Sequence, residues 1–183
     1  MAYVFLLPVA ALAAWAMFAF NRLVRLRNQV RTAWADVDVQ LQRRHDLVPL
    51  LVSAVQAYAG YESATLQAVA ELRAQALSQT RPAQLGEVEA SLERELGRLI
   101  ALKEAYPDLK ANGNFAQLQQ ELAQVEEQLQ YARRFYNGAV RDLDDGTQRV
   151  PDVLVARAFG FTGAEYFQAE AGSRDGVKVE MPK

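Results

Sequence analysis

The sequence predicts an all-α protein, in which an N-terminal transmembrane helix continues into an elongated antiparallel bundle of about four long helices and a short C-terminal helix. The first 20 residues carry no charged side chain, and four arginines follow in the next 11 residues. Beyond them, apolar residues recur every three, four or seven positions, which is the spacing of one helix face. Glycine and proline are sparse and gather at a few places, as they do at helix ends.

Residues 1–21 form the predicted membrane anchor. As a helix, residues 2–20 would rise roughly 28 Å, close to the hydrocarbon thickness of a bilayer. Such a helix is apolar on every face, which disfavours a buried helix of a soluble protein because no side suits water. A cleaved secretory signal is the other alternative. It requires positive charge before the apolar run, whereas the arginines here follow it, so the pattern favours an uncleaved anchor.

The basic flank of the anchor predicts its orientation. Arg22, Arg25, Arg27 and Arg31 should stay in the cytoplasm, which puts the N-terminus outside and the rest of the chain inside. The same four arginines are candidate lipid contacts, because they would lie near anionic head groups. The chain has no cysteine, which excludes disulfides and thiolate metal sites. Its net charge of −2 gives no field that favours nucleic acid.

Residues 22–161 are predicted to form the helical bundle, and residues 162–183 a mostly irregular tail with a strand-like pattern at 177–181. The first helix continues from the anchor to Gly60, with a kink or break near Leu47 because Pro49 lies inside it. A second helix covers residues 61–77. The apolar face of the first helix is expected to hold Leu23, Leu26, Val30, Val37, Leu41, Val48, Leu51, Val55 and Tyr58.

The third helix is predicted from Pro82 to about residue 106, with Thr80 as its N-cap. Its expected buried face is Leu85, Val88, Leu92, Leu96, Leu99 and residue 102 or 103, and its expected exposed side is Glu87, Glu89, Glu93, Arg94 and Glu95.

The fourth helix shows a nearly heptad seam, has Asn114 as its candidate N-cap, and ends or bends at residues 150–151. Asp152 is then expected to cap a short helix over 153–159, which Gly160 stops. The predicted seam comprises Phe115, Leu118, Leu122, Val125, Leu129, Ala132, Phe135, Ala139 and Leu143.

The most concentrated polar cluster in the sequence is Arg43-Arg44-His45-Asp46. A catalytic interpretation makes His45 a general base oriented by Asp46, but neighbours in sequence do not face one another on a helix. The cluster is therefore expected to hydrogen-bond carboxylates of other helices, in a network that Asp36 and Asp38 could join. The pair Arg133 and Arg134 is a second candidate, either for such pairing or for an anionic lipid or partner carboxylate.

No catalytic, cofactor-binding or metal-binding residues are predicted. A metal site in a helical bundle needs several glutamates with Glu-x-x-His pairs, and this chain has one histidine with no glutamate three residues before it. The adjacent acids Glu126-Glu127 and Asp144-Asp145 are expected to be solvated. Phosphate loops, nucleophile elbows and zincin helices are also missing from the sequence.

Four blocks of sequence resemble the LemA family of bacterial membrane proteins. They are residues 26–49, which include the Arg-Arg-His-Asp cluster, residues 104–112, residues 132–137 and Phe159-Gly-Phe161, and together they follow the family order over nearly the whole chain. The chain departs from the family at Leu143-Asp144-Asp145, where Tyr-Asn-Thr is usual, and at Pro49-Leu50-Leu51, where Pro-Asn-Leu is common. The resemblance implies a single-span protein of the bacterial inner membrane with a helical-bundle domain and no established catalytic residues.

The expected function is a non-enzymatic, membrane-anchored scaffold or adaptor of the bacterial envelope. Its partners would be membrane lipids, other membrane or envelope proteins, or copies of itself. The alternative from another class is a lipid-binding or membrane-remodelling protein that uses the basic helix next to the membrane. A third, an enzyme working at Arg43–Asp46, is disfavoured because the sequence shows no catalytic constellation.

Overall fold

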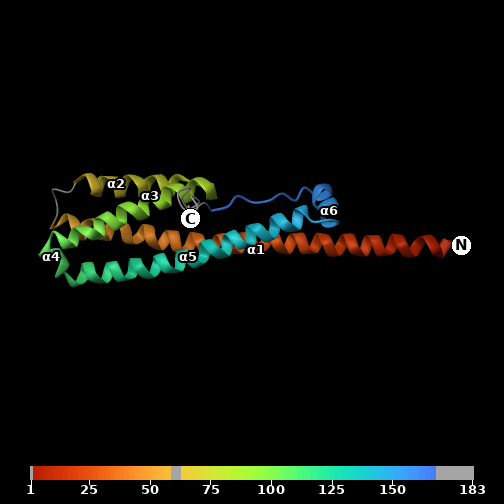
Figure 1. Cartoon of the computed structure of the whole chain (residues 1–183), viewed down its shortest axis with the longest axis horizontal. Coiled ribbons are helices and arrows are strands. Elements are labelled where there is room, and N and C mark those ends of the chain that lie inside the picture. Colours follow the sequence, from red (N-terminus) through yellow and green to blue (C-terminus); the bar gives the residue numbers. More distant parts are fainter. Residues whose placement is uncertain (1, 59–62, 168–183) are drawn as a thin grey trace, which may run out of the picture. The chain divides into compact units, whose positions relative to one another are not determined.

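A computed structural model describes residues 2–58 and 63–167, with the side chains of 2–6 and Ser63 left out. Within these residues every regular element is a helix (Figure 1). The chain divides into two compact units. Of the described residues, unit 1 contains 2–40 and 129–166, and unit 2 contains 41–58, 63–128 and 167. The elements in order are α1 (Ala2–Gln56), α2 (Ser63–Ser78), α3 (Pro82–Ala101), the 3-10 helix η1 (Leu102–Glu104), α4 (Pro107–Lys110), α5 (Gly113–Gln148) and α6 (Asp152–Phe159).

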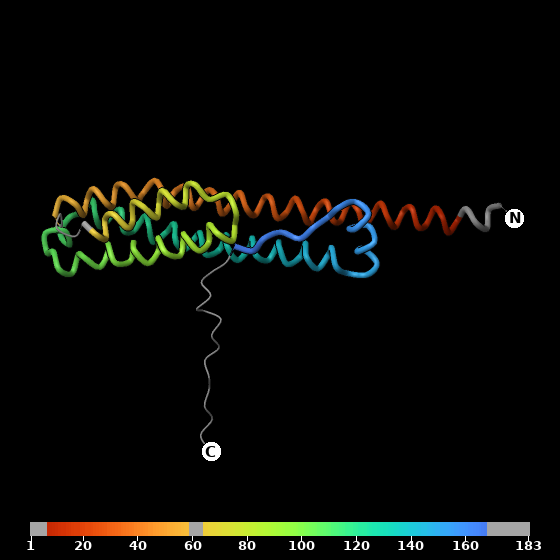
Figure 2. The backbone as a smooth tube through the Cα atoms, turned by 90° about the horizontal axis from the view of Figure 1, so that it is seen from above, coloured from red at the N-terminus to blue at the C-terminus, as the bar shows by residue number. Residues whose placement is uncertain are grey.

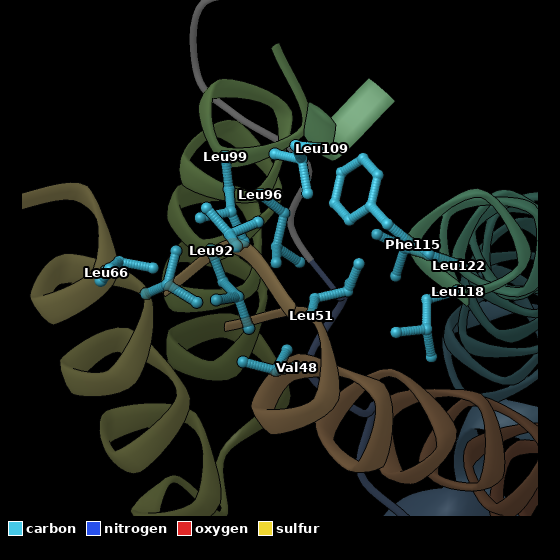
Figure 3. Packing of buried hydrophobic residues seen from close by; sticks show 12 residues of the cluster. Val48, Leu51, Leu66, Leu92, Leu96, Leu99, Leu109, Phe115, Leu118 and Leu122 are labelled. Carbon is cyan, nitrogen blue, oxygen red and sulfur yellow. The ribbon is translucent and has the colours of Figure 1, made fainter. Parts of the chain in front are cut away.

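The core of unit 2 is built from leucine and valine of α1, α2 and α3, closed by α4 and the first turns of α5. Figure 3 shows these side chains pointing toward one another from separate helices. Leu51, Leu92, Leu99, Leu109 and Phe115 are each exposed by 1 % or less. The full cluster is Val48, Leu51, Val55, Leu66, Val69, Leu92, Leu96, Leu99, Leu109, Phe115, Leu118 and Leu122.

Unit 1 buries the middle of α1 against α5 and α6. Ala19 and Leu23 of α1 form one cluster with Val155 and Ala156 of α6, and Phe20 packs edge-on to Phe159 with ring centroids 5.0 Å apart. Gly160 ends α6 with a φ of 67°, as a left-handed C-cap requires, and confirms the predicted stop. Residues 161–167 follow without regular structure.

The apolar start and the arginine segment belong to one helix, as predicted. Among the described residues, α1 is the one helix that is long and apolar enough to cross a membrane. Its most apolar stretch of 18 residues has a mean hydropathy of 1.5. Leu7, Leu12 and Phe18 in this part of α1 are 74 %, 63 % and 68 % exposed. A row of large apolar side chains that no other helix covers is what a bilayer, rather than water, would solvate.

Several helix boundaries differ from the predictions. Pro49 does not break α1, which continues for seven residues to Gln56. The N-cap of α3 is Arg81 and not Thr80, although Pro82 does occupy the first turn. The third helix ends at Ala101, before η1. In the linker that follows, Pro107 starts α4 as a single helical turn. Asp152 lies in the first turn of α6 and is not its N-cap, which is Pro151.

The N-terminus of α5 is capped by Asn112 and not by Asn114. The Asn112 side-chain oxygen accepts hydrogen bonds from the main-chain nitrogens of Asn114 (2.9 Å) and Phe115 (3.1 Å), which are free donors in the first turn. The Asn112 amide also donates to the Tyr58 hydroxyl at 3.0 Å. One side chain thus fixes the start of α5 and ties it to the segment after α1.

The apolar faces follow the predicted spacing with few exceptions. Phe135 was expected in the seam of α5 but is 52 % exposed, and Tyr136 is buried instead. Heptad spacing alternates steps of three and four residues, which lead from Leu129 to Ala132 and then to Tyr136. Strict heptad spacing therefore puts Tyr136, and not Phe135, in the buried seam. Of the face predicted for the first helix, Leu26 is half-buried, and Tyr58, which lies after the end of α1, is 41 % exposed. Tyr61 and residues 168–183, including the strand-like pattern, lie outside the described residues.

Candidate functional site

A buried polar cluster lies inside unit 2 and joins four helices. We call it the Arg44 cluster. It consists of Arg44 and His45 of α1, Arg73 of α2, Glu89 of α3 and Glu126 of α5. Arg44 and Glu89 are completely buried and His45 is 4 % exposed. Buried charges are stable only when they are paired and hydrogen-bonded, so the partners of each group decide what the cluster does.

The Arg44 guanidinium is held by carboxylates from two other helices. Its Nη1 donates to Glu89 Oε2 at 2.8 Å and weakly to the main-chain oxygen of Glu89 at 3.5 Å. Its Nη2 donates to Glu126 Oε2, and Glu93 Oε2 lies 3.8 Å from the same nitrogen. The fixed fork of a guanidinium suits such multiple pairing. Arg44 therefore connects α1 to both α3 and α5 through charge.

His45 completes the pairing of Glu89. Its Nε2 lies 2.6 Å from Glu89 Oε1, so the two carboxylate oxygens of Glu89 face two different donors. An ionised carboxylate only accepts hydrogen bonds, so His45 Nε2 carries the proton and donates. The one histidine of the chain is thereby committed to a buried structural contact.

The charge on Glu89 is maintained against the cost of its burial. Burial raises the pKa of the Glu89 carboxyl, but the hydrogen bond from His45 and the positive charge of Arg44 outweigh it. The net result is a pKa below the ordinary value of 4.5. Glu89 is therefore ionised at neutral pH, and the Arg44 cluster is a true ion-pair network.

Arg73 joins the cluster through the main chain. Its Nε donates to the carbonyl oxygen of His45 at 2.8 Å. In a regular helix this oxygen accepts from the nitrogen four residues later, which is Pro49 and has no hydrogen to give. Arg73 of α2 thus replaces the donor that Pro49 removes, and α1 continues through the proline.

Burial limits the chemistry that the Arg44 cluster can perform. Arg44 and Glu89 are completely buried and His45 is 4 % exposed, so these three side chains do not face solvent. Among residues 2–58 and 63–167, no group of three or more acidic, histidine or cysteine side chains is placed to hold a metal ion. The arrangement is suited to fixing the register of four helices.

The structure brings together only part of the predicted network. Arg44 and His45 enter the Arg44 cluster, whereas Arg43 and Asp46 are exposed, and the Asp46 carboxylate accepts from Gln42 at 2.9 Å. Asp36 and Asp38 are also exposed, on the part of α1 that belongs to unit 1. Neighbours in sequence point to different sides of a helix, and for this reason Arg43 is exposed while Arg44 is buried.

Three members of the cluster were missed by sequence reasoning. Glu89 was placed on the exposed side of α3 and is instead fully buried, which is an error that spacing could have prevented. Glu89 lies four residues after Leu85 and three before Leu92, both of which are buried. Glu126 is expected in water with Glu127, and no sequence prediction covers Arg73. Nothing in the local sequence marks their contacts with Arg44 and His45, which come from other helices.

The four arginines that follow the apolar start of α1 differ in their surroundings. Arg22 Nη1 donates to Asp152 Oδ2 at 2.8 Å, and Asp152 is 6 % exposed. The Arg27 guanidinium lies 5.1 Å from the centre of the Phe161 ring. Arg25 and Arg31 are exposed on α1. All four arginines lie in unit 1. Arg22 and Arg27 stabilise the packing of α6 and of the residues after it.

The arginine pair of α5 also divides. Arg134 is exposed and its guanidinium lies 4.7 Å from the centre of the Tyr131 ring. Arg133 is half-buried. The neighbouring Tyr136 donates its hydroxyl hydrogen to the Glu165 carbonyl at 2.7 Å and packs on Trp34, with ring centroids 5.1 Å apart. Burial, together with the Glu165 charge, raises the pKa of Tyr136 to about 12.

The Asp144 carboxylate contacts the segment after α6 and is not a free acid on the surface. The Tyr166 hydroxyl donates to Asp144 Oδ2 at 3.1 Å. A Cβ added to Gly163 would clash with Asp144 Oδ1, so a side chain at this position would require the Asp144 carboxylate to shift. These contacts hold the segment after α6 against α5 within unit 1.

Comparison with known proteins assigns the family. The LemA family model matches residues 33–181, which cover most of the chain and include the Arg44 cluster. The magnetosome proteins MamQ 1 and MamQ 2 of Paramagnetospirillum magneticum are each 22 % identical to this chain over 188 aligned positions. Each alignment covers 88 % of this chain and 69 % of the relative. The chain belongs to the LemA family of proteins.

Proposed function

We propose that this protein is a non-enzymatic, membrane-anchored scaffold or adaptor, which binds other envelope proteins or copies of itself through the surface of its helical bundle. The observation that carries the proposal is the commitment of Arg44, His45 and Glu89 to one another in the interior of unit 2. The one histidine of the chain, the side chain type most often used for general-base catalysis, is committed to Glu89, and the chain has no cysteine nucleophile. What is left for function is the surface.

The setting of this scaffold is the bacterial inner membrane, with the N-terminus outside and the bundle in the cytoplasm. LemA membership and the apolar, uncovered start of α1 support a membrane-associated protein. The arginines that follow it support the orientation by the positive-inside rule. The two relatives are named as magnetosome proteins, which supports a role at a membrane-bound compartment.

Photo-crosslinking in intact cells tests the scaffold proposal. A photoreactive residue is placed at Val39 or Leu50, which are 51 % and 53 % exposed, and at the buried Val37 as a control. We expect crosslinked species that contain a second copy or another envelope protein from the exposed positions and none from Val37. Monomer alone from every exposed position would contradict the proposal. So would hydrolysis of a phosphate, peptide or ester substrate that the His45→Ala substitution abolishes while the fold remains.

A lipid-binding or membrane-remodelling protein is the second candidate function. The exposure of Arg25 and Arg31, on the helix that carries the apolar start, favours it. Co-sedimentation of the full chain with vesicles is uninformative, because the anchor itself would insert. The discriminating comparison is vesicle tubulation by the wild type and by an Arg25→Gln, Arg31→Gln variant. Tubulation that the substitutions remove would favour remodelling over a scaffold.

A further inference from the structure

α6 packs against the last turns of the apolar part of α1. Ala19 and Leu23 of α1 form one buried cluster with Val155 and Ala156 of α6, and Phe20 packs edge-on to the rings of Phe159 and Phe161. Figures 1 and 2 show α6 beside α1, with the N-terminal part of α1 continuing beyond it. α6 therefore lies level with the end of the proposed membrane span.

The side of α6 that faces away from α1 is apolar and open. Leu154 is 63 % exposed, and Val150 in the turn before α6 is 79 % exposed. Phe159 touches Phe20 with one edge but keeps 63 % of its surface exposed. These three large apolar side chains, on and beside an eight-residue helix, are called the patch here, and their exposure costs free energy in water.

The charges around this patch are basic. The one acidic residue of α6, Asp152, is paired with Arg22 and nearly buried. Arg157 is exposed on the same side as Leu154, and Arg25 is exposed on α1 one turn beyond Arg22. An apolar face with arginines at its edge fits a bilayer that has anionic head groups.

We propose that α6 and the turn before it are a second membrane contact, lying in the head-group region of the bilayer beside the span of α1. Leu154, Val150 and Phe159 enter the outer acyl region, and Arg157 pairs with lipid phosphate. The occupant of the patch is the lipid surface, because α6 packs on Ala19 and Leu23 at the end of the apolar part of α1, whose side chains Leu12 and Phe18 are uncovered. The proposal rests on the proposed function, in that α1 must cross the membrane.

Single-cysteine labelling of the full chain tests this contact. The chain has no cysteine, so each introduced one is the sole labelling site. An environment-sensitive NBD fluorophore is attached at Leu154→Cys, and at Val150→Cys in a second variant that leaves α6 unchanged. The protein is reconstituted in phosphatidylcholine vesicles that contain phosphatidylglycerol and a nitroxide on the lipid chain near the head group. Leu12→Cys serves as the control in the span, and the exposed Asp38→Cys as the control in water.

We expect the nitroxide lipid to quench the labels at Leu154 and Val150 at least twofold, with a blue-shifted emission, while the label at Asp38 stays unquenched. Labels at Leu154 and Val150 that both behave like the one at Asp38, with the Leu12 label in lipid, would overturn this inference and leave the anchor standing. A blue shift without quenching would also overturn it, because protein, a second copy included, would then cover the patch. A Leu12 label in water would overturn the anchor and this inference together.

Discussion

The Arg73 side chain donates from Nε to the main-chain oxygen of His45 at 2.8 Å, and this oxygen is the acceptor that Pro49 leaves without its helical donor. A buried carbonyl that lacks a partner would cost free energy on the order of 1–3 kcal/mol. The contact from α2 explains why α1 continues to Gln56 despite the proline. A residue of α2 thus supplies the hydrogen-bond donor that a main-chain oxygen of α1 needs.

We therefore predict that Arg73 and Pro49 are energetically coupled. Arg73→Met should lower the free energy of unfolding by roughly 1–2 kcal/mol, because a charged donor to a part-buried carbonyl is lost. In a Pro49→Ala background the main chain can supply the missing donor, so the same substitution should cost less. Chemical denaturation of the four proteins of this cycle measures the coupling. Equal costs in the two backgrounds would contradict the assignment.

The second prediction concerns the two adjacent arginines of α1. Arg44→Met should destabilise the protein by about 3–5 kcal/mol, because Glu89 would keep a buried charge without its guanidinium partner. Arg43→Met is the matched control and should change stability by no more than about 0.5 kcal/mol, since Arg43 is exposed. Thermal and denaturant unfolding compare the two. Similar losses for both variants would show that the Arg44 cluster does not hold the fold.

The third prediction is a dependence of stability on pH. The Glu89 pKa is below 4.5 in the folded protein, because His45 and Arg44 outweigh burial, and returns to its ordinary value on unfolding. The unfolded chain then binds more protons as the pH falls below about 4.5, so the stability that Glu89 contributes is present above this pH and is lost as the pH falls through its folded value. The side chains that contact Glu89 are Arg44 and His45, and Arg44 also faces Glu93 and Glu126.

Glu89→Gln should remove this part of the pH dependence. The free energy of unfolding of the variant, measured by denaturation across the acidic range, should fall less steeply below about pH 4.5 than that of the wild type. Glu104, whose pKa is lowered by the hydrogen bond from Lys110, contributes equally to both proteins and cancels in the comparison. Identical slopes in the two proteins would assign the acid sensitivity to other carboxylates.

The fourth prediction concerns orientation. In the cysteine-free chain, Asp38→Cys places one thiol on an exposed position of α1, beyond the arginines. With the bundle in the cytoplasm, a membrane-impermeant maleimide added to spheroplasts should leave this thiol unmodified until the cells are lysed. Modification of intact spheroplasts would reverse the topology and place the bundle outside.

Helical periodicity was enough to predict most of the buried apolar residues. Leu92, Leu96 and Leu99 of α3, and Leu129 and Leu143 of α5, follow from spacing alone because one face of each helix is buried. The capping of α5 by Asn112 was harder to predict, because Asn112 and Asn114 are equally good capping residues. Which of them caps the helix depends on the residue at which its first turn begins.

The polar contacts could be predicted only in part. That Arg44 and His45 would bind carboxylates of other helices followed from the density of charge on one helix turn. Which carboxylates they bind depends on how helices far apart in sequence pack, and the contact from Glu89 spans 45 residues. Charged residues are mostly exposed, and this general tendency led to the wrong placement of Glu89, whose position in the apolar stripe was the better guide.

The central claim is that the apolar start of α1 holds this helical protein in a membrane, where its surface serves as a scaffold. Alkaline carbonate extraction of membranes from cells that express the full chain tests this most directly, because it releases peripheral proteins and leaves spanning ones in the pellet. We predict that the protein stays in the pellet, and that detergent releases it. Its appearance in the carbonate supernatant would contradict the anchor, and with it the scaffold proposal and the membrane contact of α6.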